Sequence, residues 1–422
     1  KTALQTPLDV MLICRRGKGK LCYGASARAT FQRRSGRRRL HRAELEAELE
    51  SVTSCYLEPY GNCKGAYLGG ENLSGKDLMW IDLRNADLSG ADLSYAHLDY
   101  ADLTGANLTN ATLTNTYLWN ADLTGANLEN ATLTNTHLPN ADLSSAYLPN
   151  ASLTGAYLDY ADLTGAYLEN ATLTAAILYE ADLTAAILYE TNLMDADLWY
   201  ADLTRANLIG VDLTGAYLIG ADLTGADLYE ATLTAAHLYG ADLTGANLEN
   251  ATLTGAYLIG ADLTGAYLIG ADLTGAELYN ADLTAAILYE ANLMDADLAG
   301  ADLTGAELYN ATLTNANLGG ADLTDAILYE ANLTGADLME ADLAGALLYS
   351  ADLTGAELVA ADLTGAILYG ADLTNANLQY ADLKFANFVD ATVTDADFSD
   401  TYWHQTIWTD GDRYDSNPET NS

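Results

Sequence analysis

The chain has few positive charges, few cysteines and no long apolar segment. Residues 43–422 contain only six Lys and Arg residues but 58 Asp and Glu residues. No stretch approaches the ~20 consecutive apolar residues that a transmembrane helix requires. The sequence therefore predicts no membrane span, and the scarcity of bases argues against direct nucleic-acid binding by this part of the chain.

The four cysteines all lie in the first 63 residues. Cys55 and Cys63 flank Pro59 and Gly61, and their C-x7-C spacing does not match the short spacing of zinc ligands. In an oxidising compartment the two would form a disulfide, and otherwise they are free thiols in a loop. The sequence leaves both alternatives open.

Residue types suited to catalysis are scattered along the chain. No Ser/His/Asp, Cys/His or H-E-x-x-H grouping is present, and no inserted loops interrupt the middle of the chain to build a pocket. The sequence predicts a protein that is not an enzyme, with no catalytic residues, no metal site and no cofactor. The five histidines are His41, His97, His137, His237 and His404.

One regularity dominates the rest of the sequence. Every fifth residue from Leu68 to Leu383 is Leu, and the residue two positions earlier is almost always Ala. A period of five belongs neither to a helix nor to a flat strand, so the chain must turn a corner every five residues. An unbroken tandem repeat of this kind predicts a solenoid. Aromatic and aliphatic residues continue the register at Phe388, Val393, Phe398, Trp403 and Trp408.

A second period of twenty residues indicates four sides. The residue before Leu is Asp in all sixteen repeats from Asp82 to Asp382 at twenty-residue steps, whereas ten residues away it varies among Thr, Ser, Asn and Asp. A coil of twenty residues explains this difference, and a coil of ten does not.

The motif A-[D/N]-L-x-x, for example Ala101-Asp102-Leu103-Thr104-Gly105, resembles the pentapeptide repeat family. The resemblance implies an all-β fold, a right-handed, four-sided parallel β-helix with Leu and the small residue inside. We expect about 17 coils of 20 residues, stacked at roughly 4.8 Å into a rod about 80 Å long. Each coil would bury its apolar groups only against its neighbours.

Charge and pattern divide the chain into four segments. Residues 1–42 carry 12 Lys and Arg and a single acid, which suits a basic leader or a disordered arm; removal of such a leader would fit an organellar or exported protein. Residues 43–64 are expected to form an N-terminal cap, with a short helix over 41–52. Residues 65–410 form the β-helix, and residues 411–422 are a polar tail expected to fray.

The Asp residues at twenty-residue steps form a predicted acidic ladder along one side of the rod. Their side chains either hold cations between rungs or accept hydrogen bonds from nearby backbone or water. The ladder includes Asp102, Asp122, Asp142, Asp162, Asp182, Asp202, Asp222, Asp242, Asp262, Asp282, Asp302 and Asp322.

A second side carries an apolar patch over five consecutive rungs, where a column of Tyr lies beside a mostly aliphatic column. A contiguous outward patch predicts a protein partner or a second copy of the chain, although Tyr packing along a β-face for its own stability gives the same pattern. The patch consists of Ile287, Tyr289, Tyr309, Ile327, Tyr329, Leu347, Tyr349, Ile367 and Tyr369.

These features predict a non-enzymatic β-helical rod that acts as a scaffold or protein-binding surface. An alternative comes from the charge of residues 65–410, where 50 acids and four bases leave a net charge of −46. Over about 80 Å this is one charge per ~1.8 Å, close to the ~1.7 Å of duplex DNA. Family resemblance then implies an acidic DNA mimic that binds a type II topoisomerase such as gyrase.

Overall fold

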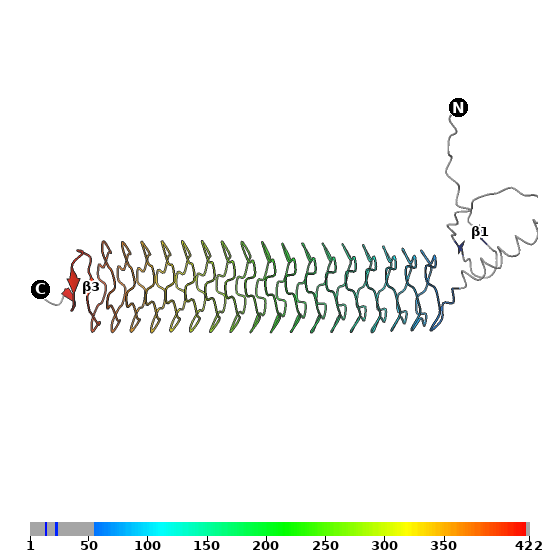
Figure 1. The fold of residues 1–422 in the computed structure, drawn as a ribbon, viewed down its shortest axis with the longest axis horizontal. Helices are drawn as coiled ribbons and strands as arrows, with labels where there is room; N and C mark the ends of the chain where they lie inside the picture. Colours follow the sequence, from blue (N-terminus) through cyan, green and yellow to red (C-terminus); the bar gives the residue numbers. More distant parts are fainter. Residues whose placement is uncertain (1–12, 15–21, 24–54, 419–422) are drawn as a thin grey trace, which may run out of the picture.

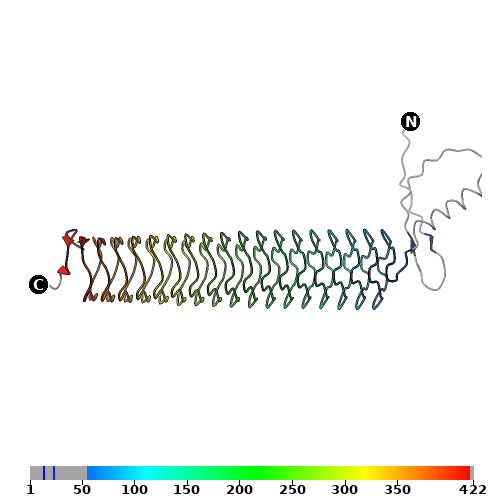
Figure 2. The ribbon, with the colours of Figure 1, turned by 60° about the horizontal axis from the view of Figure 1, so that its bottom comes forward.

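A computed structural model describes residues 13–14, 22–23 and 55–418. Residues 55–418 form an elongated rod of stacked coils without protruding loops (Figures 1 and 2). The predicted helix over 41–52 lies outside the described residues, as does most of the basic segment 1–42. The described part of the predicted cap, residues 55–64, contains no helix. Two short strands, β1 (Ile13–Cys14) and β2 (Cys22–Tyr23), pair antiparallel.

The rod repeats every twenty residues, as the sequence predicted. Parallel bridges join each residue before a central Leu to the residue twenty positions later, from Asn62↔Asp82 to Asn387↔Ile407. Four bridges occur per coil, so the cross-section has four sides. The backbone N–H of Leu83 donates to the carbonyl of Asp102 at 2.7 Å, and the Asp102 N–H donates back to Ile81 at 2.9 Å. Each coil is thus hydrogen-bonded to the next one on every side.

We number the sides by chain order. Face 1 carries the central residue Leu83 and every twentieth residue after it, and faces 2, 3 and 4 carry Leu88, Leu93 and Leu98 in the same way. Faces 2 and 4 are therefore opposite each other. The residue before each central residue occupies the leading position and the residue after it the trailing position, and both point outward.

The corners require an unusual backbone conformation. Every corner residue from Tyr60 to Gln405 has a φ between 51° and 70°, in the left-handed region. The corner is closed by a hydrogen bond such as that from the Ala86 N–H to the Leu83 carbonyl, and a positive φ at the third residue is typical of type II turns. Gly and Asn adopt this conformation at low cost, which explains their frequency at these positions.

The core is a continuous stack of Leu and Ala side chains that are at most 1% exposed over most of the rod. Four Thr residues are buried in it, all of them two residues before a central residue, where Ala is usual. Each Thr hydroxyl donates to a Leu carbonyl of the preceding coil, for example Thr116 to Leu93 at 2.8 Å. No buried side-chain hydroxyl within residues 55–418 lacks a partner. The four are Thr116, Thr136, Thr191 and Thr406.

Aromatic side chains that continue the five-residue register close the C-terminal end of the rod. Phe388, Phe398, Trp403 and Trp408 are buried, and the Trp408 ring centroid lies 5.1 Å from those of Phe398 and Trp403. The prediction that the tail frays from residue 411 is wrong for its first part. The strand β4 (Arg413–Tyr414) pairs antiparallel with β3 (Thr406–Ile407), because a turn at Gly411 folds the chain back onto the last coil.

At the other end, Cys63 occupies the central position of face 1 in the first coil and is 2% exposed. A disulfide joins Cys63 to Cys55. The bond fastens the segment that enters the rod to the first coil.

Candidate interaction surfaces

The structure brings the nine residues of the predicted apolar patch together on face 2. The leading positions of this face are bridged in sequence, and the Tyr residues occupy the trailing positions beside them. Neighbouring Tyr rings make edge-on or tilted contacts, with centroids 6.3 Å apart for Tyr289 and Tyr309 and 4.9 Å apart for Tyr329 and Tyr349. We call these nine residues the face 2 patch.

The face 2 patch is partly open to solvent. Tyr289 is 36% exposed and Tyr369 is 43% exposed, whereas the aliphatic residues beside them are half-buried. Among the leading and trailing positions of these rungs the one charged residue is Glu307, which accepts a hydrogen bond from the Tyr289 hydroxyl. This hydrogen bond raises the pKa of Tyr289, and it turns the Glu307 carboxylate toward its neighbour. The rings therefore stabilise one another and still leave an apolar surface.

Face 4 carries a larger apolar surface that the sequence reasoning missed. In the leading positions, the rings of His97, Tyr117, His137 and Tyr157 stack with centroids 4.7, 4.9 and 4.6 Å apart and interplanar angles below 10°. Further along the same column His237 stacks between Tyr217 and Tyr257, 4.8 Å from each. Alternating His and Tyr rings thus form two ladders along the axis.

The trailing positions of face 4 extend this surface. Trp119 is 52% exposed and Trp199 is 38% exposed, and the Tyr239 ring packs 5.8 Å from Tyr257. Among the leading positions from His97 to Tyr257 only Asp197 is acidic. We call the apolar residues of these nine rungs the face 4 patch: His97, Tyr117, Trp119, His137, Pro139, Tyr157, Ile177, Tyr179, Trp199, Tyr217, Ile219, His237, Tyr239, Tyr257 and Ile259.

Electrostatics within the face 4 patch follow from burial and from neighbouring acids. Burial raises the pKa of Asp159, and the nearby carboxylate of Asp197 raises it further. A hydrogen bond to the Glu180 carboxylate raises the pKa of Tyr179 to about 12. Both groups therefore hold their protons more tightly than usual.

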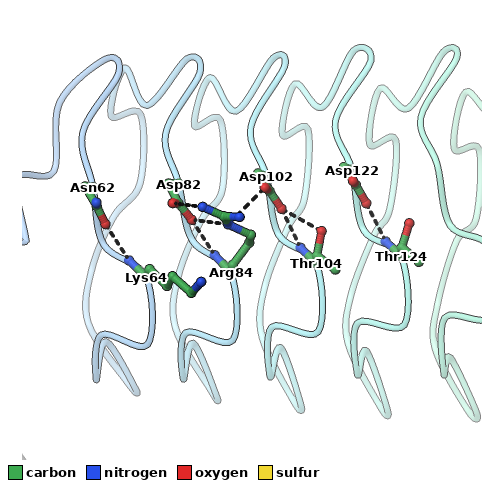
Figure 3. A network of polar contacts seen from close by, with 8 residues as sticks. All are labelled: Asn62, Lys64, Asp82, Arg84, Asp102, Thr104, Asp122 and Thr124. Atoms are coloured by element: carbon green, nitrogen blue, oxygen red, sulfur yellow. Dashed lines mark hydrogen bonds and ion pairs between the residues drawn. The ribbon is translucent and has the colours of Figure 1, made fainter.

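The acidic ladder lies on face 1, where the sequence placed it. Each of the sixteen Asp residues from Asp82 to Asp382 accepts a hydrogen bond from the backbone N–H two residues further on, at 2.8 to 3.1 Å. Figure 3 shows this contact at Asp82, Asp102 and Asp122. The carboxylate satisfies a donor at the start of the corner, as it does in an Asx-turn.

Arg84 neutralises part of the ladder near its N-terminal end. Its guanidinium contacts the Asp82 carboxylate at 2.6 Å and the Asp102 carboxylate at 3.1 Å, so it bridges two rungs (Figure 3). Hydrogen bonding to Arg84 holds the pKa of Asp82 below its usual value. Within residues 55–418 no group of three His, Cys, Asp or Glu side chains is arranged to hold a metal ion.

The role of the ladder Asp residues can be tested by two substitutions at one position. We expect Asp222→Ala to destabilise the rod by about 1 kcal/mol, because the Thr224 N–H loses its 2.9 Å acceptor. Asp222→Asn keeps the acceptor and removes one charge from a column of like charges, so it should be neutral or stabilising. Thermal unfolding at low salt measures both. Equal losses for the two variants would show that the charge, and not the acceptor, matters.

Comparison with known proteins identifies the family. The family model described as pentapeptide repeats matches residues 62–99, 101–140, 140–174, 176–215, 212–250, 251–288, 291–328, 326–365 and 366–402. The chain therefore belongs to the pentapeptide repeat family, whose members form right-handed quadrilateral β-helices.

Several solved structures of this family are similar to the chain. HetL, from the cyanobacterium Nostoc sp. strain PCC 7120, is 34% identical over 65% of this chain and 91% of HetL, with a TM-score of 0.21. The plasmid-mediated fluoroquinolone resistance protein QnrB1 is 21% identical over 46% of this chain and 93% of its own, with a TM-score of 0.36. A thylakoid lumen protein of Arabidopsis thaliana is 30% identical over 25% of this chain and 66% of its own, with a TM-score of 0.14. No curated protein matches the chain.

No helix in the part of the chain that the structure describes is long and apolar enough to cross a membrane.

Proposed function

We propose that this protein is a non-enzymatic scaffold that binds another protein through the face 2 patch. The observation that carries the proposal is the composition of the leading and trailing positions of this face over five rungs, where Glu307 alone is charged and its carboxylate is held by Tyr289. Glu290 and Glu330 lie at the corners that border this surface. Aromatic and aliphatic side chains that lie side by side on a flat surface form the core of many protein interfaces. The surrounding acidic faces stay in water and keep the rod soluble.

The absence of loops on the rod supports binding over catalysis. Every coil has the same four sides, and the outward side chains stand in columns at a rung spacing of roughly 4.8 Å. General acid–base catalysis needs two groups in different environments, whereas the ladder carboxylates all make the same backbone hydrogen bond. A periodic surface of this kind suits recognition of an extended partner.

Affinity capture with the full chain tests this proposal. A patch variant carries Tyr309→Ser, Tyr329→Ser, Tyr349→Ser and Ile327→Asn, all at outward positions, so the fold should persist. A matched control carries Asn107→Ser, Asn127→Ser and Glu129→Ser on the polar half of the same face. We expect partners to be retained by the wild type and the control and lost, at least tenfold, by the patch variant. Recovery of the same partners from all three would overturn the proposal.

The acidic ladder supports a second candidate function, an acidic DNA mimic that binds a type II topoisomerase. The ladder of sixteen carboxylates on face 1 gives one side of the rod a regular negative charge at rung spacing. A gyrase supercoiling assay with added protein tests it. The mimic should inhibit or protect the enzyme, and replacing ladder Asp residues by Asn should remove the effect while the face 2 substitutions leave it unchanged.

A further inference from the structure

The two apolar patches lie on opposite faces and at opposite ends of the rod. The face 4 patch extends from His97 to Ile259, and the apolar rungs of face 2 extend from Tyr267 to Tyr369. Outside these limits the leading positions of face 4 are polar or acidic, whereas face 2 mixes polar and acidic residues with apolar ones such as Tyr147, Tyr167 and Ile187. The leading positions of face 4 continue with Glu277, Asp297, Asn317, Asp337 and Glu357, while the polar half of face 2 includes Asp87, Asn107, Glu129 and Glu169.

We propose that the chain assembles with further copies of itself by laying the face 4 patch of one copy on the face 2 patch of the next, with the two rods parallel and staggered. This inference rests on the proposed role of the face 2 patch as a protein-binding surface, and it names a second copy of the chain as the partner. Both surfaces are sides of the same rod, whose stacked coils carry no protruding loops (Figures 1 and 2). Their side-chain columns share one rung spacing, so they can match rung for rung.

Charge selects this arrangement over the others. Two parallel rods in register would place Ile327 and its neighbours on the acidic half of face 4, near Asp337. Two antiparallel rods would bring the apolar patches together but would also press Asp87, Glu129 and Glu169 against the acidic half of face 4 along the remaining length. Like charges facing each other across an interface are unfavourable. Parallel rods shifted along the axis avoid both contacts, because the acidic halves then extend past each other into water.

The size of the shift follows from the positions of the patches. The centre of the face 4 patch lies at rung 177, and that of the apolar rungs of face 2 from Tyr267 to Tyr369 lies midway between rungs 307 and 327. The two centres are therefore about 140 residues, or seven rungs, apart. Seven rungs correspond to a stagger of roughly 34 Å. Each copy uses one face to bind the preceding copy and the opposite face to bind the following one. Such a head-to-tail contact does not close, so assembly continues beyond a dimer.

Sedimentation velocity of the purified full chain over a range of concentrations tests the inference. The wild type should form species that grow with concentration without a limit at the dimer. Added salt should strengthen assembly, because it screens the repulsion between acidic rods. A wild type that remains monomeric overturns the inference. The proposed scaffold function survives that outcome if capture through the face 2 patch still recovers a different protein.

Variants on each face decide between this contact and a symmetric one. A face 4 variant carries Tyr117→Ser, Trp119→Ser and Tyr157→Ser, and the face 2 variant is the one described above. Each variant alone should lose all association. An equimolar mixture of the two variants should form dimers and nothing larger, because the face 4 variant keeps an intact face 2 patch and the face 2 variant keeps an intact face 4 patch. Association of the face 4 variant like that of the wild type would indicate a symmetric face 2 contact and overturn the inference, as would a mixture that stays monomeric.

Two controls separate assembly from folding. The exchange Tyr117→His with His137→Tyr keeps the ring ladder and should assemble as the wild type does. If the triple face 4 variant fails to give the wild-type circular dichroism spectrum, the pair Trp119→Ser and Trp199→Ser replaces it, since both side chains are exposed and outside the ring ladder. Assembly of that folded pair at wild-type strength would also contradict the inference.

Discussion

Leu223→Asp should lower the stability of the rod by at least about 4 kcal/mol and split its unfolding into separate transitions. Leu223 is fully buried in the stack of central residues on face 1, and its N–H donates to the Asp242 carbonyl of the next coil at 2.6 Å. A carboxylate at this position has no polar partner, because the side chains around it are Leu and Ala. The penalty for burying the charge adds to the lost packing.

The split follows from the architecture of the rod. Each coil contacts only its neighbours, so the stability of the whole is a sum of coil terms and interface terms. Residue 223 lies near the middle, and a disrupted coil there uncouples the two halves. Calorimetry should show two transitions for Leu223→Asp, and hydrogen exchange should locate the loss of protection around residues 203–243.

Matched substitutions define the cause. Leu223→Met conserves volume and should cost less than about 1.5 kcal/mol. Leu373→Asp places the same charge near the C-terminal end, where it should unfold only the last coils and leave a long folded rod. A single transition shifted equally by Leu223→Asp and Leu373→Asp would show that the rod unfolds as one cooperative unit.

The sequence predicted the β-helix, its four sides and the position of the acidic ladder. This was possible because one residue type, Leu, marks every repeat, and because the Asp at twenty-residue steps differs from the residues on the other sides. The role of those Asp residues was left open between cation binding and backbone contacts. The choice depends on the direction of the side chain at the corner, which the pattern alone does not give.

The face 4 patch was missed although its signal was present. His97, His137 and His237 form no catalytic grouping, yet successive members are 40 and 100 residues apart, and both spacings are multiples of the twenty-residue coil. Alignment of the sequence in rows of twenty would have placed them in one column with Tyr117 and Tyr157. The β3–β4 hairpin was missed for a different reason, since the polar composition of residues 411–418 resembles that of a frayed tail.

Deletion of residues 261–265, one whole repeat, should preserve the fold. It should rotate the surface pattern of the C-terminal half of the rod by one face relative to that of the N-terminal half. The deletion joins Gly260 to Ala266, so the inward Leu and the left-handed corners keep their spacing. All later residues then move by one face, and the face 2 patch comes to lie at a right angle to the face 4 patch. Deletion of residues 261–280 removes one complete coil and is the matched control, because it leaves every later residue on its original face.

Deletion of three residues, 261–263, should be far more damaging than either. The remaining Thr264 and Gly265 must then span one whole side of the coil, which five residues normally cover, so the adjoining repeats have to unfold. We expect melting temperatures of the five- and twenty-residue deletions within a few degrees of the wild type, and a large drop or a second transition for the three-residue deletion.

Assembly through opposite faces should persist in the twenty-residue deletion and change shape in the five-residue deletion, because successive copies would then be related by a quarter turn. Electron microscopy of the two deletions distinguishes these shapes, and identical assemblies would show that the two patches do not act together.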